Sequence, residues 1–251
     1  MNELIDIKNL YVAYDSKTVL EGVNLSIYER DFIGIIGPNG GGKTTLLKAI
    51  LGLIEPLSGQ IVFSPGLNRD AMGYLPQVHK FDTKFPISVF DVIRSGLHQP
   101  FGRNASIRRA QKKNVERIVA GLGIENIARN PIGELSGGQM QRVFLGRAIV
   151  SDPKLLILDE PDTYVDNLFE HELYQKLKEL NERMAILLVS HDVGTISTHV
   201  KSIACVNREL HYHPSNIISP EQLASYNCPI QIITHGSVPH TVLKIHHSHE
   251  S

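Results

Sequence analysis

The chain has 251 residues and carries 25 basic and 26 acidic side chains, which leaves a formal net charge of −1. This balance excludes the strong basic excess typical of proteins that bind nucleic acid non-specifically. The longest apolar runs are strand-sized, well short of the roughly 18 residues that a membrane-spanning helix needs. The N-terminus does not resemble a signal peptide, and two cysteines are too few for a disulfide framework, so we expect a protein of the reducing cytosol.

Strand patterns dominate the first third of the chain. Apolar or alternating segments cover residues 4–11, 19–28 and 32–36, and residues 43–53 are good helix formers. We expect this β-rich region to extend to about residue 84.

Helices are expected between residues 85 and 151. Ser88 is placed to cap a helix over residues 89–97, and a second helix covers residues 105–122. The apolar stripe of the second helix consists of Ile107, Val115, Ile118, Val119 and Leu122.

From residue 152 strands and helices alternate again. Apolar strands are predicted at residues 155–158 and 186–189, on either side of a helix over residues 166–183. A hairpin-like pair follows at residues 202–206 and 209–212, and the tail beyond it is poorly patterned. Buried strands that alternate with helices indicate an α/β fold with a parallel sheet, here with a helical insertion.

The segment GPNGGGKT fits the phosphate-loop pattern G-x-x-x-x-G-K-[ST], and it stands between an apolar strand and a helix. Glycines let backbone N–H groups turn toward phosphate oxygens, and the helix N-terminus adds a favourable dipole. We expect Lys43 to reach the β- and γ-phosphates and the Thr44 hydroxyl to bind Mg²⁺. The alternative is a glycine-rich turn with a chance lysine. The predicted nucleotide-binding residues here are Gly37, Pro38, Asn39, Gly40, Gly41, Gly42, Lys43, Thr44 and Thr45.

A second acidic site is predicted at the end of the strand LLILDEP. Ligands of open α/β folds bind at the carboxyl ends of the strands, where Asp159 and Glu160 would lie. We expect Asp159 to hold Mg²⁺ through water and Glu160 to polarise the attacking water as a general base. The alternative is an acidic strand end that only begins a turn at Pro161.

The segment LSGGQMQR predicts a second helix end that binds anions. Ser136 and Gln139 have the spacing of a capping box for a helix that runs to Val150. Because one phosphate loop is already complete, a second anion site makes sense if it closes over the nucleotide of another subunit. The alternative is an ordinary capped surface helix. The apolar face predicted for this helix consists of Met140, Val143, Phe144 and Ala148.

Together with the phosphate loop, LLILDEP and a histidine after a strand, LSGGQMQR resembles the signature of the ATP-binding cassette of ABC transporters, over at least residues 4–210. The resemblance implies a P-loop NTPase fold with a mixed sheet core, an antiparallel β subdomain and a helical subdomain. It implies that Tyr14 stacks on adenine, that Gln77 contacts Mg²⁺ or water, and that His191 holds the γ-phosphate. It also implies that two cassettes sandwich two ATP molecules, with Ser136, Gly137, Gly138, Gln139 and Asp166 at the interface.

The resemblance divides the chain into four segments. Residues 1–84 and 152–210 are expected to form the nucleotide-binding core with its β subdomain. Residues 85–151 would form the helical subdomain that carries the signature. Residues 211–251 would form a histidine-rich C-terminal extension.

Three short stretches look like the zinc, manganese and iron importer branch: FPISVFDV, IACVNREL and the segment from Cys228 to His240. We expect an ATP-hydrolysing motor of such an importer, peripheral on the cytoplasmic face of the inner membrane. Its partners would be a second cassette, separate membrane permease subunits and, indirectly, a solute-binding protein, but no nucleic acid. An importer of another small substrate and a soluble non-transport ABC ATPase remain alternatives, as does a metal-buffering protein.

Two polar stretches can be interpreted either as functional sites or as solvated surface. Seven of the 12 histidines follow residue 210, and His240, His246, His247 and His249 either sense cytosolic metal or form a solvated end. The basic stretch over residues 103–117 is either a solvated helix face or a contact with the membrane subunit or lipid head groups.

Overall fold

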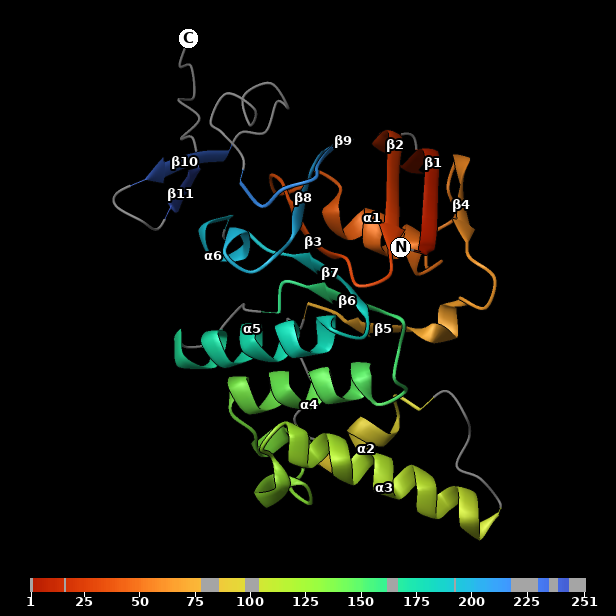
Figure 1. Ribbon diagram of the computed structural model, residues 1–251, viewed down its shortest axis with the longest axis vertical. Coiled ribbons are helices and arrows are strands. Elements are labelled where there is room, and N and C mark those ends of the chain that lie inside the picture. The colour runs from red at the N-terminus through yellow and green to blue at the C-terminus, as the bar shows by residue number, and fades with distance from the viewer. Residues whose placement is uncertain are drawn as a thin grey trace. The chain divides into compact units, whose positions relative to one another are not determined.

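The computed structural model describes residues 2–15, 17–77, 86–97, 104–161, 167–191, 193–217, 230–234 and 239–243. They fall into two compact units, the first made of Met1–Pro65 and Leu187–Ser251 and the second of Gly66–Ile186. Figure 1 labels the elements of both.

The first unit contains a three-stranded antiparallel sheet. Strands β1 (Glu3–Tyr14), β2 (Lys17–Tyr28) and β4 (Ser58–Phe63) are ordered β2-β1-β4. Alternating apolar side chains of β1 and β2 are buried on one face of this sheet. The same alternation is visible in the sequence, and it predicted these two strands. Strand β4 was not predicted, because most of its side chains are exposed and its sequence lacks an apolar run.

A second set of strands in the first unit is mixed, with a buried parallel pair and an antiparallel strand beside it. Strand β3 (Phe32–Ile36) pairs in parallel with β8 (Ser202–Asn207), and β9 (Glu209–His213) returns antiparallel to β8. The last three residues of β7 (Ala185–Val189) also belong here, so the order in this unit is β7-β3-β8-β9.

The described residues of the first unit also include two helices and a hairpin. Helix α1 (Lys43–Ile50) follows β3, and α6 (Val193–Ser197) lies so close to β3 that a Cβ on Gly34 would stand 2.8 Å from Ile196 Cδ1. Strands β10 (Ile230–Thr234) and β11 (Pro239–Leu243) form an antiparallel hairpin in the tail that the sequence left unpatterned. Helix α1 ends three residues earlier than predicted, because Gly52 (φ 67°) turns the backbone out of the helix.

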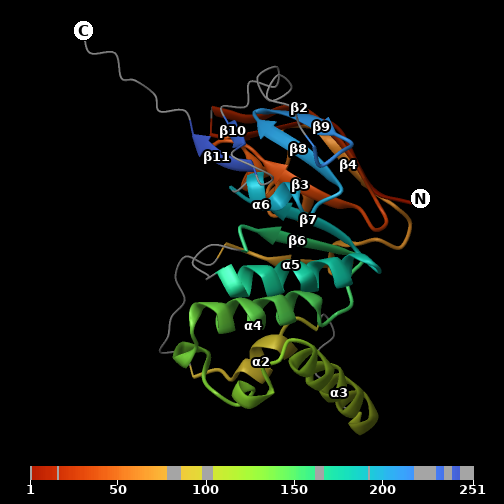
Figure 2. The same cartoon turned by 60° about the vertical axis from the view of Figure 1, so that its left-hand side comes forward.

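The second unit combines strands with a stack of helices. Strand β5 (Met72–Leu75) pairs in parallel with β6 (Leu155–Asp159), and β7 begins in this unit beside β6. Figures 1 and 2 both show α4 (Gly137–Ile149) between α5 (Asn167–Asn181) on one side and α2 (Val89–Arg94) with α3 (Ala105–Gly121) on the other. Short 3₁₀ turns occur at Arg69–Ala71, Glu125–Ile127 and Ile132–Glu134.

Two predicted apolar faces need correction. Ile107 is 45% exposed rather than part of the buried stripe of α3, because the packing of this helix begins only at Val115. On α4, Val143 and Ala148 are buried as predicted, but Met140 and Phe144 are only half-buried. Leu145 and Ile149 fill the core side instead, together with Val143, Gly146 and Ala148.

Candidate functional site

The loop after β3 has a conformation that requires glycine. Gly37, Gly40 and Gly42 have φ angles of 148°, 77° and 104°, all in the region that other residues rarely adopt. A Cβ on Gly37 would stand 2.0 Å from the Val206 carbonyl oxygen, so no side chain fits there. A Cβ on Gly40 would meet no atom within 4 Å, which leaves the tip of the loop open to a ligand.

Lys43 braces this loop from inside. Its side chain is 5% exposed, and Nζ donates hydrogen bonds to the carbonyl oxygens of Gly37 (2.9 Å) and Pro38 (3.1 Å). The N-cap of α1 is Gly42, which makes no side-chain cap bond, and the first turn of the helix has no acidic residue. The loop therefore combines a buried ammonium with a positive helix end, an arrangement suited to phosphate.

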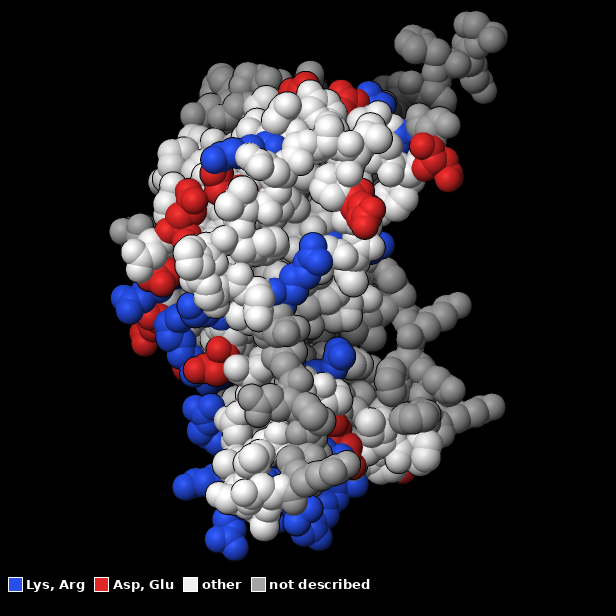
Figure 3. Space-filling view, turned by 90° about the vertical axis from the view of Figure 1, so that its right-hand side faces the viewer, with Lys and Arg blue, Asp and Glu red and all other residues white. Residues whose placement is uncertain are grey.

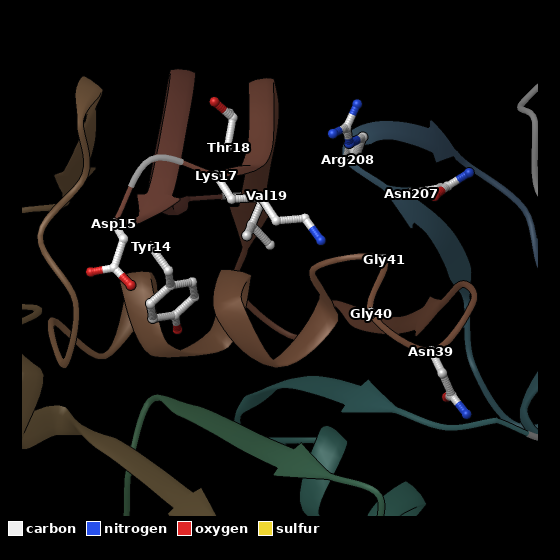
Figure 4. Close-up of a pocket in the computed structure, with 10 residues that line it drawn as sticks. All are labelled: Tyr14, Asp15, Lys17, Thr18, Val19, Asn39, Gly40, Gly41, Asn207 and Arg208. Carbon is white, nitrogen blue, oxygen red and sulfur yellow. The ribbon is translucent and has the colours of Figure 1, made fainter.

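A cavity of about 760 Å³ adjoins the loop. Figure 4 shows the Tyr14 ring on one side of it and the Gly40–Gly41 turn on the other, with the Lys17 side chain extending between them. An aromatic ring opposite a phosphate loop fits an adenine nucleotide, since the base can stack while the phosphates reach the glycines. The lining residues are Tyr14, Asp15, Lys17, Thr18, Val19, Asn39, Gly40, Gly41, Asn207 and Arg208.

His191 belongs to the same unit. It follows β7 by two residues, and the backbone N–H of buried Ser190 donates to the Ile35 carbonyl of β3 at 3.3 Å. The histidine thus extends from the strand that neighbours the one carrying the glycine loop.

The second unit holds the predicted carboxylates at the end of β6. Asp159 and Glu160 are 1% and 7% exposed, and Glu160 has a φ of 52°, an unfavourable conformation for a side chain of this size. The Gln77 amide donates a hydrogen bond to the Glu160 carboxylate, although the two residues are 83 positions apart. The predicted carboxylates and Gln77 are therefore brought together.

The pKa of Tyr74 is affected by the negative charge at this strand end. Burial of its ring, reinforced by the negative charge of Asp159, raises the pKa of Tyr74 to about 12. Tyr74 pairs with Ile157 in the β5–β6 register, and Ile157 stands two residues before Asp159. The negative charge of Asp159 therefore disfavours the ionised, negatively charged form of Tyr74.

Helix α4 begins with the predicted capping box. Ser136 Oγ accepts from the Gln139 N–H (3.3 Å), and Gln139 Oε1 accepts from the Ser136 N–H (3.0 Å). Gly137 is exposed and Gly138 half-exposed at this end. Arg142, one turn later, bonds to the Leu122 carbonyl (3.0 Å) and to Glu172 of α5, which anchors the helix.

Comparisons with known proteins agree with this geometry. Residues 20–163 match the ABC transporter family. The chain is 37% identical over 224 residues to a probable metal transport system ATP-binding protein of Thermotoga maritima, covering 88% of this chain and 89% of that one.

The chain belongs to the ABC transporter family.

Relatives with named substrates are similar over most of this ABC cassette. The zinc import ATP-binding protein ZnuC of Pasteurella multocida is 36% identical, with 82% of this chain and 74% of that protein covered. The zinc uptake system ATP-binding protein ZurA of Listeria innocua is 36% identical, with coverages of 84% and 85%.

Solved structures confirm the fold. An inward-facing ABC transporter classed as metal-chelate type superimposes with a TM-score of 0.79 over 97% of both chains, at 24% identity. An ATP-binding cassette of an ABC transporter superimposes with a TM-score of 0.76 over 90% of this chain and 99% of the other, at 22% identity. The predicted family membership and mixed α/β architecture are thus confirmed, and the chain is an ABC-type ATPase cassette.

Some predicted residues of this cassette lie outside the described part. Asp166, His246, His247 and His249 are among them, and only the backbone of His240 is described, in β11. Within the described ranges, no group of three or more His, Cys, Asp or Glu side chains is placed to hold a metal ion. No helix in those ranges is long and apolar enough to cross a membrane.

The sequence alone missed one wall of the cavity beside the glycine loop. This wall consists of Asn207, the last residue of β8, and Arg208 in the turn to β9, whose N–H donates to the Gly41 carbonyl at 2.9 Å. The hairpin was predicted, but its approach to the glycine loop depends on the pairing of β3 with β8, which has no local signal.

Proposed function

We propose that this cassette hydrolyses ATP to drive the uptake of a transition metal ion, zinc or manganese, through separate membrane permease subunits. The observation that carries the nucleotide part is the glycine loop braced by Lys43 beside a cavity with an aromatic wall. Support for the metal comes from relatives at 36–37% identity that are named for zinc or metal transport. An ABC importer of another small substrate and a soluble non-transport ABC ATPase remain the alternatives.

Each part of the phosphate loop has a separate task in this proposal. Backbone N–H groups from Gly40 to Thr45 surround the phosphates, and Lys43 bonds to the β- and γ-phosphate oxygens in exchange for its two carbonyl contacts. Tyr14 stacks on the base. The Lys43 charge is already buried and oriented, so little reorganisation is needed when negative charge develops.

Mg²⁺ fits the oxygen donors that this chain offers. The Thr44 hydroxyl, the Asp159 carboxylate and the Gln77 amide oxygen are the groups that would hold it, and such oxygens are its preferred ligands. When bound, Mg²⁺ neutralises phosphate charge.

Glu160 is proposed as the general base. Glu160 is nearly buried, and its carboxylate accepts a hydrogen bond from Gln77, which fixes its orientation. It would accept the proton of the water that attacks the γ-phosphorus in line, while His191 donates a hydrogen bond to a γ-phosphate oxygen.

The signature helix completes the site in a dimer of two cassettes. Ser136, Gly137, Gly138 and Gln139 would face the γ-phosphate of the ATP held by the partner subunit, and Asp166 would lie at the same interface. The dipole of α4 favours an anion at this end. ATP would therefore close the dimer, and hydrolysis would reopen it and move the permease subunits. The cassette would act at the cytoplasmic face of the inner membrane, as a peripheral subunit that never contacts the transported ion.

The decisive variant is Glu160→Gln, compared with Glu182→Gln on an exposed position of the same unit. We expect Glu160→Gln to bind ATP normally, to accumulate as a dimer with ATP, and to hydrolyse ATP at least about 100-fold more slowly, the range for loss of a general base. Glu182→Gln should match the parent chain. Full turnover by Glu160→Gln, or a monomer in ATP, would contradict the mechanism.

Isotope uptake tests the substrate separately. Cells that carry the parent chain should accumulate zinc or manganese more than cells that carry Glu160→Gln. If the protein hydrolyses ATP but the cells take up neither ion, the proposed metal substrate is wrong and the proposed ATPase activity stands.

A further inference from the structure

Helix α3 is anchored by only its second half. Its buried side chains are Val115, Ile118 and Val119, and the Asn114 amide donates to the Val150 carbonyl at 2.7 Å. Residues 104–110 are all exposed, and Asn104 caps the helix through a hydrogen bond from the Ser106 N–H (2.8 Å). The first turns therefore project into solvent, without the tertiary packing that usually stabilises a short helix.

Four cations cluster on this projecting part: Arg108, Arg109, Lys112 and Lys113. At 100° per residue they occupy about 140° of the helix circumference, which is a single face. Figure 3 shows the blue side chains that project around the end of α3. Within the described residues, this face contains one ion pair, in which Lys112 Nζ lies 3.7 Å from Glu116 Oε1.

The position of these cations is unfavourable for the isolated helix. The first turn of α3 contains no acidic residue, and a helix N-terminus already carries positive partial charge. The four cations repel one another, and Arg108 and Arg109, which lie next to the first turn, also repel that charge. An external anionic surface would convert this repulsion into attraction, so the arrangement favours such a partner over a merely solvated face.

We propose that the first half of α3 binds the anionic head groups of a phospholipid membrane. Lysine and arginine side chains near an anionic bilayer each add to its attraction for the protein. The chain as a whole has a net charge of −1, so the attraction arises from this local cluster and not from overall charge.

Lipid fits this surface better than a loop of the permease does. Cytoplasmic loops of membrane proteins carry an excess of lysine and arginine, which would repel four more cations. Lipid binding would help to hold the cassette at the membrane between encounters with its permease. It needs neither ATP hydrolysis nor a particular transported ion, so it stands apart from the proposed function.

Flotation with vesicles tests this proposal on the full chain. We expect the protein to float with vesicles of one-third phosphatidylglycerol in phosphatidylcholine, and not with phosphatidylcholine alone. Replacing Arg108, Arg109, Lys112 and Lys113 by glutamine should lower the partition coefficient on the order of 100-fold, since each cation adds several-fold. Raising the salt from about 0.05 to about 0.5 M should have a similar effect, because it shortens the screening length.

A second quadruple variant controls for net charge. Lys48→Gln, Arg69→Gln, Lys154→Gln and Lys178→Gln removes four cations from other elements and should bind vesicles like the parent chain. Both variants should keep the parent circular dichroism and ATPase rate without vesicles, which excludes misfolding as the cause.

Three results would overturn the proposal. The parent chain could fail to distinguish the two kinds of vesicle, or both quadruple variants could lose binding equally. The α3 variant could also bind vesicles normally and lose only its binding to purified permease, which would assign the face to the membrane protein.

Discussion

Helices α1 and α4 both begin in glycine-rich segments, but their first turns are built in opposite ways. Gly42 caps α1 with no side chain, and the end is braced by the buried Lys43 ammonium. Ser136 caps α4 through a reciprocal pair of hydrogen bonds with Gln139. The α1 end presents a buried ammonium and no capping side chain, whereas the α4 end satisfies two N–H groups with its own side chains.

This difference indicates separate roles for the two ends. The α1 end combines the buried Lys43 ammonium with the positive end of the helix dipole, which suits a primary phosphate site. The α4 end satisfies two of its N–H groups with its own side chains and offers its dipole and exposed Gly137, which suits a contact made only when a partner arrives. The following variants test this contrast, from the largest expected effect to the smallest.

Lys43→Ala should cause the largest loss of ATP binding. It removes a buried charge from the phosphate loop and leaves the Gly37 and Pro38 carbonyls without their donor. Loss of charge-assisted hydrogen bonds of this kind weakens binding by roughly 30-fold or more. Titration with a fluorescent ATP analogue measures it, and Lys48→Ala on the same helix should stay within about twofold, as an isolated surface change does. Equal losses would show that helix stability, not the buried ammonium, governs binding.

Gly37→Ala and Gly40→Ala separate steric conflict from backbone strain. Both positions have positive φ, but only the Gly37 methyl would meet the Val206 carbonyl, at 2.0 Å. We expect Gly37→Ala to lower the free energy of unfolding by about 3 kcal/mol or more, and Gly40→Ala by about 1 kcal/mol. Urea denaturation measures both. Similar values would mean that the loop moves away from Val206 at little cost.

Ser136→Ala should have a small effect on stability and a selective effect on turnover. Loss of the capping bond costs about 1 kcal/mol. Ser88 is the N-cap of α2, accepting from the Asp91 N–H at 3.1 Å, so Ser88→Ala is a matched control with a similar cost. Only Ser136→Ala should slow ATP hydrolysis while a single cassette still binds ATP. Equal rates in the two variants would remove α4 from the proposed dimer site.

Several elements were predictable because their signals are local. Strand β3 was predicted with its observed bounds, since five consecutive residues are buried, and the caps at Ser88 and Ser136 were read from single side chains. Strand β4 was missed because its pairing with β1 is long-range and its side chains are mostly exposed. Ile107 was misassigned because helical periodicity extends along α3 beyond the point where the packing stops.

The sequence alone determined the family and the chemistry of the separate parts of this nearly neutral chain. It could do so because the glycine loop, the acidic strand end and the signature are each continuous along the chain. Only the tertiary structure decided which distant groups meet. Gln77 reaches Glu160 across 83 residues, and Arg208 reaches Gly41 through the β3–β8 pairing. Such contacts depend on strand pairing, whose register is a property of the assembled sheet and not of either segment alone.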